Sequence, residues 1–266
     1  MRFSGTKGFT GTITDIGGPT ANMYGARCEK NYACGRASCL FPTICSRLCA
    51  DHCELLRLLN AILKWKGKQK RKINVFVASG VRHDLALASP QYIKLLATHF
   101  TGGHLKVAPE HICPNVLELM GKPPFELFGE FEEQFARAGA KAGKEQYIVP
   151  YFISSHPGCT CEDTLKLTEY LVSRNWHIRQ VQDFIPLPMT TSAAMYFAGR
   201  STKGKNIHIP KGQAEKRLQL SLLQYHDSRN IKAIADYLHS RKAEELLSRI
   251  RHIQATAKKN PDRGFE

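Results

Sequence analysis

Cysteine is the residue type with the clearest chemical potential in this sequence. There are nine cysteines, and six of them fall within residues 28–53. An odd, clustered set does not fit a disulfide framework in a large cytosolic domain, which leaves metal binding, redox chemistry or burial. Four thiolates could hold zinc or an auxiliary iron–sulfur cluster, although their gaps are wider than in the usual chelating pairs. The candidate ligands are Cys28, Cys34, Cys39 and Cys45. Buried free thiols are the alternative, and we assign Cys49 and Cys53 to packing.

Glycines and polar residues that could bind a ligand follow several predicted strands. Five short runs of β-branched or aromatic residues are typical of strands: 8–16, 73–79, 104–108, 146–154 and 178–184. The segments that follow them are rich in Gly, Pro or polar groups: 16–20, 79–82, 108–111, 154–158 and 184–188. If the strands are parallel, these segments gather at one edge, which is where such sheets bind ligands.

Helices are predicted between these strands, which favours a parallel sheet with right-handed crossovers. Apolar residues at three- and four-residue steps predict helices over 53–64, 90–100, 125–142 and 161–174. Pro90 suits a first helical position after Ser89, and Thr160 suits an N-cap before the acidic pair Glu162 and Asp163. Three further helices are predicted near the C-terminus, over 211–226, 230–239 and 242–257.

Composition excludes some classes of protein. The 266 residues are 42% hydrophobic and carry a net charge of +15, so the chain is neither disordered nor collagen-like. It has no apolar stretch of membrane-spanning length and no secretory signal, which predicts a cytoplasmic protein without a membrane partner. Between residues 200 and 263, fifteen Lys and Arg stand against six Asp and Glu. This basic region could contact nucleic acid, although a solvated helix face is the more common reason for such a pattern.

The order of these motifs resembles a radical S-adenosylmethionine (SAM) barrel, and it is more similar still to the YgiQ family of uncharacterised radical SAM proteins. The resemblance rests on residues 15–24, 34–39, 42–45, 105–122, 142–147, 152–160 and 181–189. Residues 225–227 match the C-terminal domain of unknown function of that family. Together these motifs cover the chain from Lys7 to about Leu247.

The resemblance implies an α/β fold: a partial (β/α)6 TIM-like barrel that lacks its first strand, plus a small helical domain. The expected domains are a barrel portion over 1–199, with a Cys-rich insert at 24–53, and a basic helical domain over 200–266. It also implies an enzyme that uses SAM and a [4Fe–4S] cluster on an unknown substrate, with zinc or a second cluster on the four cysteines.

The resemblance further implies which residues bind SAM. Gly17 and Gly18 would let the backbone approach the methionine part, because neither has a Cβ. Pro19 stands where many relatives place Glu, which leaves Thr20 and backbone carbonyls for that role. Arg82 would hold the SAM carboxylate through paired hydrogen bonds, or else form an ion pair with its neighbour Asp84.

The later strand ends supply the remaining candidates. Glu110 and the adjacent His111 would contact ribose or move a proton, or else form a turn. Three residues would contact ribose or adenine, with a plain turn as the alternative for the histidine: Ser154, Ser155 and His156. Gln182 and Asp183 would line the substrate cavity, or else simply close the last strand.

One family feature is absent from this sequence. The resemblance places the catalytic cluster on Cys-x3-Cys-x2-Cys after the first barrel strand, and the chain contains no such motif. We therefore expect the C-terminal portion of a radical SAM protein, inactive alone and completed by an N-terminal chain. The alternative is a non-enzymatic binding protein, stabilised by zinc or an iron–sulfur cluster, with a basic tail that contacts nucleic acid.

Overall fold

The computed structural model of the chain describes residues 7–18, 20–29, 34–178 and 181–259. The chain divides into two compact units, and each is described by itself. The first unit comprises Met1–Ala108 and Glu126–Pro150, and the second comprises Pro109–Phe125 and Tyr151–Glu266. The predicted modules 1–199 and 200–266 are a division of the sequence, and they stay a prediction.

The first unit contains a parallel pair of short strands, β1 (Thr12–Ile13) and β4 (Asn74–Val75), with Thr12 opposite Asn74. Both strands lie inside predicted runs, but the regular ladder is only two residues long. Pairing continues irregularly beyond it, since the amide of Ile16 donates to the carbonyl of Phe76 at 2.9 Å. A second pair, β2 (Arg27–Cys28) and β3 (Leu48–Cys49), is antiparallel and lies in the Cys-rich segment.

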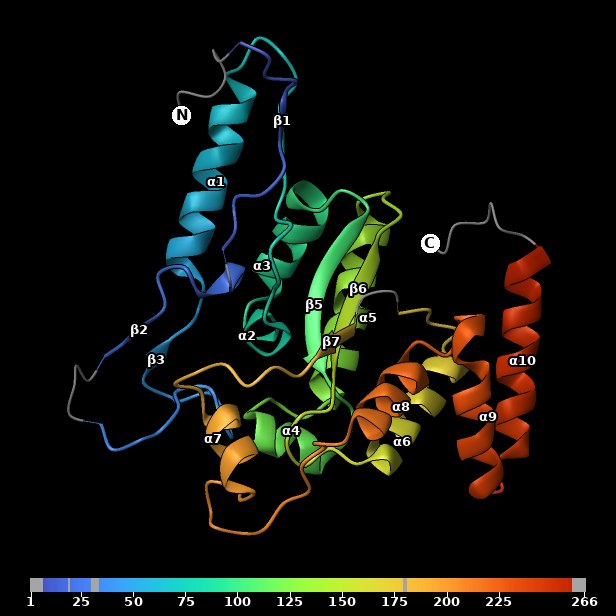
Figure 1. Ribbon diagram of the computed structural model, residues 1–266. Helices are drawn as coiled ribbons and strands as arrows, with labels where there is room; N and C mark the ends of the chain where they lie inside the picture. The colour runs from blue at the N-terminus through green and yellow to red at the C-terminus, as the bar shows by residue number, and fades with distance from the viewer. Residues whose placement is uncertain (1–6, 19, 30–33, 179–180, 260–266) are drawn as a thin grey trace. The chain divides into compact units, whose positions relative to one another are not determined.

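Several helices and helical turns belong to the first unit. They are α1 (Cys53–Gly67), α2 (His83–Leu87), α3 (Pro90–Leu95) with its π-helical continuation η3 (Leu96–Phe100), and α5 (Glu126–Lys141), together with the short 3-10 turn η2 (Ala21–Met23) (Figure 1). Phe128, Phe131 and Phe135 place one face of α5 in the core, each at most 1% exposed. Steps of three and four residues put such side chains on one helical face, as the sequence predicts.

A three-stranded sheet has the order β5 (His104–Glu110), β6 (Tyr147–Ser154) and β7 (Val181–Asp183). β6 and β7 are parallel, with Ser154 opposite Asp183. In the first unit, a parallel bridge pairs Val81 with Val107 of β5. The fold is therefore mixed α/β, with parallel strands and intervening helices, and the strands in the described residues do not form a closed barrel.

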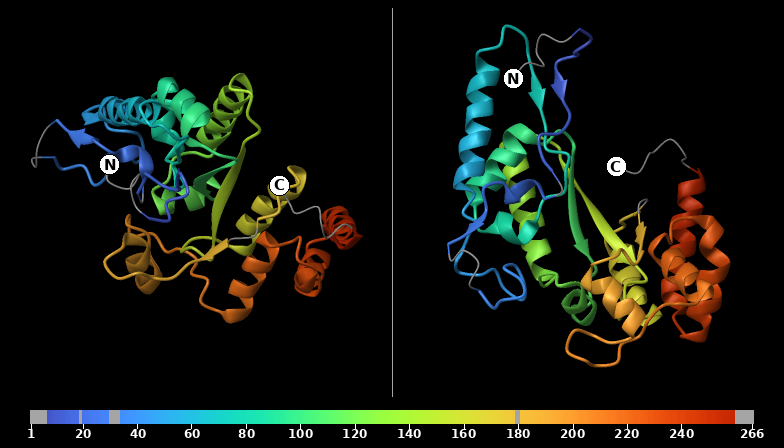
Figure 2. Two further views of the ribbon diagram at one scale, coloured as in Figure 1. Left: turned by 90° about the horizontal axis from the view of Figure 1, so that it is seen from above. Right: turned by 60° about the vertical axis from the view of Figure 1, so that its left-hand side comes forward.

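Several helices and helical turns belong to the second unit, and some of them form one large hydrophobic core. They are α4 (Pro114–Met120), α6 (Cys161–Ser173), α7 (Thr191–Ala198), α8 (Gln213–Leu223), η4 (Ser228–Asn230), α9 (Ile231–Ser240) and α10 (Glu244–Lys259). Phe152 of β6, Leu171 of α6, Leu222 of α8 and Leu238 of α9 are completely buried in that core. Figures 1 and 2 show α9 and α10 side by side. The C-terminal helices thus pack on the last strands rather than standing apart.

Local signals in the sequence explain where several helices begin. Thr160 caps α6 and Pro90 opens α3, both as predicted, and Thr160 also forms a reciprocal capping box with Asp163. Three helices were not predicted from periodicity, α2, α4 and α7, because each is too short to show a helical repeat. No helix in the described part of the chain is both long and apolar enough to cross a bilayer.

Candidate functional site

A tight loop in the first unit carries the Gly-Gly motif. The carboxylate of Asp15 accepts hydrogen bonds from the amides of Gly17 at 2.8 Å and Ala78 at 3.0 Å. The hydroxyl of Ser79 also donates to this carboxylate. These contacts tie the loop after β1 to the segment after β4, as expected at the carboxyl ends of neighbouring parallel strands.

The two glycines of this loop have different roles. A Cβ on Gly17 would lie 2.8 Å from Cβ of Ser79, so the close approach of the two segments itself requires glycine. A Cβ on Gly18 would meet nothing within 4 Å. Packing therefore explains Gly17, whereas Gly18 leaves space beside the backbone that a ligand could enter. Pro19 lies outside the described residues, and the carbonyl of the half-buried Thr20 accepts from the amide of Met23 at 3.0 Å.

Arg82 is held inside the first unit by two partners. Its guanidinium donates to both carboxylate oxygens of Asp84, at 3.0 and 2.6 Å, which matches the alternative role proposed from sequence. The Asn22 side chain brackets the Arg82 backbone, since it accepts from the Arg82 amide and donates to its carbonyl, both at 2.8 Å. Arg82 is thus already ion-paired, which favours a positioning role over a free guanidinium ready for a ligand.

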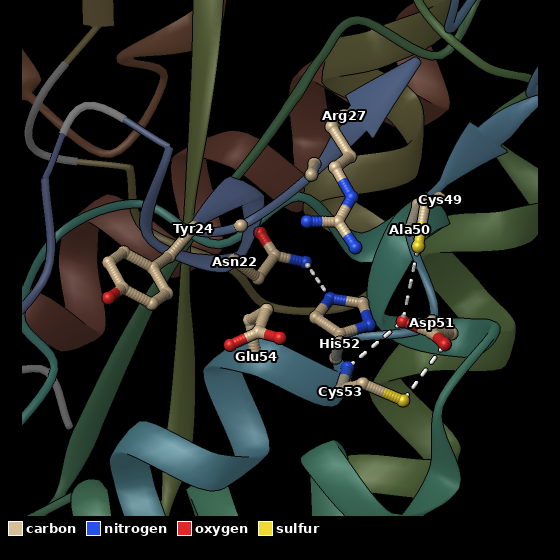
Figure 3. A pocket seen from close by; sticks show the side chains of 11 residues that line it. Asn22, Tyr24, Arg27, Cys49, Ala50, Asp51, His52, Cys53 and Glu54 are labelled. Atoms are coloured by element: carbon tan, nitrogen blue, oxygen red, sulfur yellow. Dashed lines mark hydrogen bonds between the residues drawn. The ribbon is translucent and has the colours of Figure 1, made fainter. Parts of the chain in front are cut away.

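A pocket of about 140 Å³ lies between the turn after η2 and the start of α1 (Figure 3). Asp51 accepts from the amide of Cys53 at 3.0 Å and from its thiol at 2.9 Å. Cys53 is exposed, so the assignment of this cysteine to packing is wrong: it is the first residue of α1 and its side chain lines the pocket. Cys49 is half-buried on β3 and lines the same pocket.

His52 lines this pocket, and its ring accepts a hydrogen bond at Nε2. A backbone amide can only donate, so the Asn22 atom that accepts from Arg82 is Oδ1, and its Nδ2 therefore donates to His52 Nε2 at 3.3 Å. Burial lowers the pKa of His52, which favours the neutral ring, and the hydrogen bond from Asn22 to Nε2 leaves the proton on Nδ1. Nδ1 is buried without a partner among the described residues. The N–H on this atom suits an acceptor and not a metal ion, which would need its lone pair.

In the second unit, the end of β6 combines paired and unpaired polar groups. The hydroxyl of Ser154 donates to the carboxylate of Asp183 across the β6–β7 pair at 2.9 Å. Ser155 is completely buried and its Oγ has no partner among the described residues, while its amide donates to Gln219 at 2.9 Å. Its φ of +61° is rare for a residue with a side chain. Gln182 is exposed, and its side-chain Nε2 donates to the Asp183 backbone carbonyl at 3.2 Å.

His156 has both ring nitrogens engaged. Nδ1 lies 2.8 Å from the carbonyl of Pro157, which can only accept, so Nδ1 carries the proton. Nε2 then accepts from the hydroxyl of Ser192, at 2.8 Å. Burial lowers the pKa of His156 to about 4, so the ring is neutral at physiological pH. The residue links the loop after β6 to the first turn of α7.

The end of β5 is likewise satisfied internally. Glu110 forms an ion pair with Lys122 at 2.9 Å, and its φ is +69°. His111 is 1% exposed, accepts from the Cys113 amide at 3.0 Å and lies 3.6 Å from the Cys159 thiol. Burial lowers the pKa of His111 to about 4, which does not favour proton transfer near neutrality.

The four candidate cysteine ligands are not gathered into a metal site. Cys34 is exposed and the other three are half-buried. Within residues 7–18, 20–29, 34–178 and 181–259, no group of three or more His, Cys, Asp or Glu side chains is arranged to hold a metal ion. A metal centre on Cys28, Cys34, Cys39 and Cys45 therefore stays a prediction.

Asp163 is expected to make the second unit sensitive to acid. Burial acts to raise the pKa of its carboxyl, but hydrogen bonds from Thr160 and Asn115 outweigh burial and lower the pKa below its usual 3.8. Its stabilisation is therefore present above about pH 4 and is lost as the pH falls through the lowered folded-state pKa. Asp163→Ala should lower the free energy of unfolding by about 1–2 kcal/mol at pH 7. It should also make that free energy depend less on pH, as measured by urea unfolding at pH 7 and pH 3. Glu169→Gln, an exposed change on the same helix, should do neither; an equal loss at both pH values for Asp163→Ala would contradict the account.

Sequence reasoning missed three side chains that organise these sites. Asn22 lay within the motif at 15–24, but its bonds to Arg82 join residues 60 positions apart. Ser192 belongs to no motif, and Lys122 lay within the motif at 105–122 but was given no role, since its partner Glu110 is twelve residues away. Only the folded chain brings them to His156 and Glu110.

The sequence is similar to known proteins over most of its length. Residues 179–263 match a family described as a domain of unknown function, DUF3362. A UPF0313 protein of Vibrio vulnificus is 44% identical over 241 residues, which are 87% of this chain and 31% of the relative. A UPF0313 protein of Methanocella arvoryzae is 41% identical over 243 residues, 90% of this chain and 40% of the relative. The UPF0313 protein YgiQ of Escherichia coli K12 is 41% identical over 249 residues, which are 90% of this chain and 33% of the relative. The chain thus spans about a third of the length of the curated relatives it matches.

Proposed function

Because the chain belongs to the UPF0313 family that includes YgiQ, and spans about a third of its relatives' length, we propose that it supplies the SAM-binding part of a radical SAM enzyme. When bound, SAM would provide the 5′-deoxyadenosyl group that such enzymes use to abstract hydrogen from a substrate. The residues of this chain bind and orient the cofactor. The substrate is unknown.

The strand arrangement supports a partial barrel as the scaffold. β1 pairs with β4, Val81 after β4 bridges to Val107 of β5, and β5, β6 and β7 are consecutive neighbours. These strands follow one another in chain order and are separated by helices, and the pairs β1–β4, Val81–Val107 and β6–β7 are parallel. Such an arrangement is typical of an open portion of a (β/α) barrel. Loops at their carboxyl ends are the expected binding positions.

The buried hydroxyl of Ser155, which has no partner among the described residues, is the observation that best supports the proposal. A completely buried hydroxyl without a partner among the described residues costs about 1–3 kcal/mol, a cost that a hydrogen bond to a ligand would offset. Its left-handed backbone adds further strain, of the kind that collects at ligand sites. A hydroxyl of the SAM ribose would satisfy the Ser155 Oγ. This agrees with the role that the motif predicts.

Gly18 supports the same proposal independently, in the first unit. Its backbone is open to the approach of a ligand, since a Cβ would meet nothing within 4 Å. Other predicted contacts are better described as positioning residues, because each already has a partner inside the protein: Arg82, Glu110, Ser154 and His156. Each of them holds a strand-end loop in place within its own unit.

The [4Fe–4S] cluster does not fit the side chains that the structure describes. They include no ligand set of three or more His, Cys, Asp or Glu. We therefore assign no residue of this chain to the cluster. The proposal concerns SAM binding, which can be measured without a cluster.

Substitution of Ser155 should change stability and SAM affinity in opposite directions. Ser155→Ala removes a buried hydroxyl that no described residue partners, so the free energy of unfolding should rise by about 1 kcal/mol. Loss of a hydrogen bond to the ligand should weaken SAM binding about five- to ten-fold. Calorimetric titration and urea unfolding of the same variant give both numbers. A loss of stability with unchanged affinity would mean that the hydroxyl is structural.

Gly18 offers a matched steric test in the same titration. Gly18→Val should fold normally, because nothing in the described protein opposes the new side chain, yet it should reduce SAM binding by at least about ten-fold. Gly129→Val on α5, where the space is equally open, is the control and should bind SAM like the parent chain. Equal affinities for the two variants would remove Gly18 from the site.

A further inference from the structure

The first unit carries a basic run that is separate from the predicted SAM site. Six of the nine residues from 64 to 72 are Lys or Arg and none is acidic. The run begins in the last turn of α1, passes through the loop that follows and ends just before β4. Four of its lysines are exposed: Lys64, Lys68, Lys70 and Lys72. Six like charges in one short segment repel one another, so the arrangement has an electrostatic cost without a counter-charge.

Folding brings further cations to this run. Lys144, in the loop between α5 and β6, donates to the carbonyls of Ala97 and Thr101 at 3.4 and 3.2 Å, which anchors it beside η3. Burial, with Lys144 and Lys72, lowers the pKa of Lys66. Burial, with Lys66 and Lys144, also lowers the pKa of the exposed His99 on η3. These cations are therefore near enough to repel one another, although they come from three separate segments.

A groove of about 430 Å³ adjoins these cations, between α3 and α5. Its charged lining residues are Lys94, Arg137 and Lys141, and its lining also includes the polar Thr98 and Gln134. Arg137 pairs with Glu133, which is not part of the lining, so the groove itself presents positive charge. The groove reaches Thr98 and Ala142, which are close in sequence to His99 and Lys144.

Aromatic rings lie at the same end of the strands. His104 at the start of β5 and Tyr147 at the start of β6 place their ring centroids 6.2 Å apart, and both side chains are exposed. The Tyr147 amide donates to the carbonyl of Gly103, two residues after the Thr101 carbonyl that Lys144 contacts. Beside these rings, the carboxylate of Glu145 accepts a hydrogen bond from the Tyr147 hydroxyl.

We propose that this basic end of the first unit, comprising residues 64–72, His99, Lys144 and the adjoining groove, binds single-stranded nucleic acid. Clustered cations match a chain of phosphates, and exposed rings beside a basic groove offer stacking positions for unpaired bases. The large exposed aliphatic side chains among the described residues lie elsewhere, at Ile185, Leu187 and Met189. A membrane-binding surface would need such side chains beside the cations.

This surface lies at the amino-terminal ends of β5 and β6, whereas the predicted SAM contacts follow the carboxyl ends of strands. The inference therefore does not rest on the proposed function. It also differs from the expectation that the C-terminal helices contact nucleic acid, and the two can be compared directly.

Fluorescence anisotropy of a labelled 20-nucleotide single strand, with the full chain, tests the inference. Binding should weaken with salt, and the triple variant Lys68→Gln, Lys70→Gln, Lys72→Gln should bind about ten-fold more weakly at 0.1 M salt. With about 0.7 counterions released per phosphate contact, the log–log salt slope should become less steep by about two. Tyr147→Leu should weaken binding at least about five-fold, through loss of stacking.

A matched triple variant serves as the control. Arg217→Gln, Lys232→Gln and Arg251→Gln remove three exposed cations from the C-terminal helices and should leave the affinity within about two-fold of the parent chain. If both triple variants weaken binding equally, the attraction is only that of net charge, and the inference is wrong. It is also wrong if the C-terminal variant alone loses binding, or if the chain binds phosphatidylserine vesicles but not the oligonucleotide.

Discussion

Phe131→Ala is expected to destabilise the first unit by about 3–5 kcal/mol, the loss typical of truncating a fully buried phenylalanine. Phe131 is 0% exposed and stacks on Phe135, with ring centroids 6.0 Å apart. Phe128, one turn earlier, meets the ring of His83 edge-on at 5.7 Å. Truncation would leave a cavity between these rings, and the loss of stability should appear in urea unfolding followed by near-ultraviolet circular dichroism.

The solvent face of the same helix provides the control for Phe131. Glu130→Ala removes an exposed side chain whose bond partner is Gln134, so it should change stability by less than about 0.5 kcal/mol. Similar effects of the two substitutions would contradict the assignment of the phenylalanine face to the core.

Gly158→Ala is expected to destabilise the second unit by about 3 kcal/mol. The φ of Gly158 is +89°, where a side chain costs about 1–2 kcal/mol, and its new Cβ would lie 2.0 Å from Cδ1 of Leu119. The Leu119 side chain or the loop must shift, which adds about 1–3 kcal/mol. Because Gly158 follows His156 and Pro157, the shift should also disturb the loop after β6 and weaken SAM binding.

A double-mutant cycle separates the two causes at Gly158. In the Leu119→Ala background the steric contact is gone, so Gly158→Ala should cost only the backbone strain, about 1–2 kcal/mol. Full additivity of the two substitutions would show that the contact with Leu119 is not what opposes a side chain at Gly158.

Much of the fold follows from local sequence signals. All five predicted strands were found in their predicted order, and the four internal helices lie where periodicity places them. The capping box at Thr160 was predictable because its two partners are three residues apart. The strands β1 and β4 are shorter than their hydrophobic runs. Gly11, with a φ of +93°, interrupts the first run just before β1.

The behaviour of the site could not be predicted to the same extent. Sequence motifs identify the strand ends, but not which side chains the fold satisfies internally. Glu110 finds Lys122 twelve residues away, and His156 finds Ser192 thirty-six residues away. Such distant pairs depend on tertiary packing, which no local pattern encodes. All the SAM contacts stay predictions, and the proposal rests on two of them, Gly18 and Ser155, because the other residues discussed already have partners inside the protein.

Charge shows the same limit. The excess of Lys and Arg after residue 200 is apparent from composition, whereas the basic end of the first unit depends on Lys144 and His99 reaching residues 64–72 in space. Convergence of segments distinguishes a binding surface from a solvated charged face, and it is visible only in the folded chain.

The binding of SAM by this chain tests the central proposal most directly. Equilibrium dialysis of the purified protein against labelled SAM should show saturable binding to one site per chain, displaced by excess S-adenosylhomocysteine and weakened by Ser155→Ala. Absence of saturable binding at millimolar SAM, with the protein folded by circular dichroism, would contradict the proposal that these strand ends hold the cofactor.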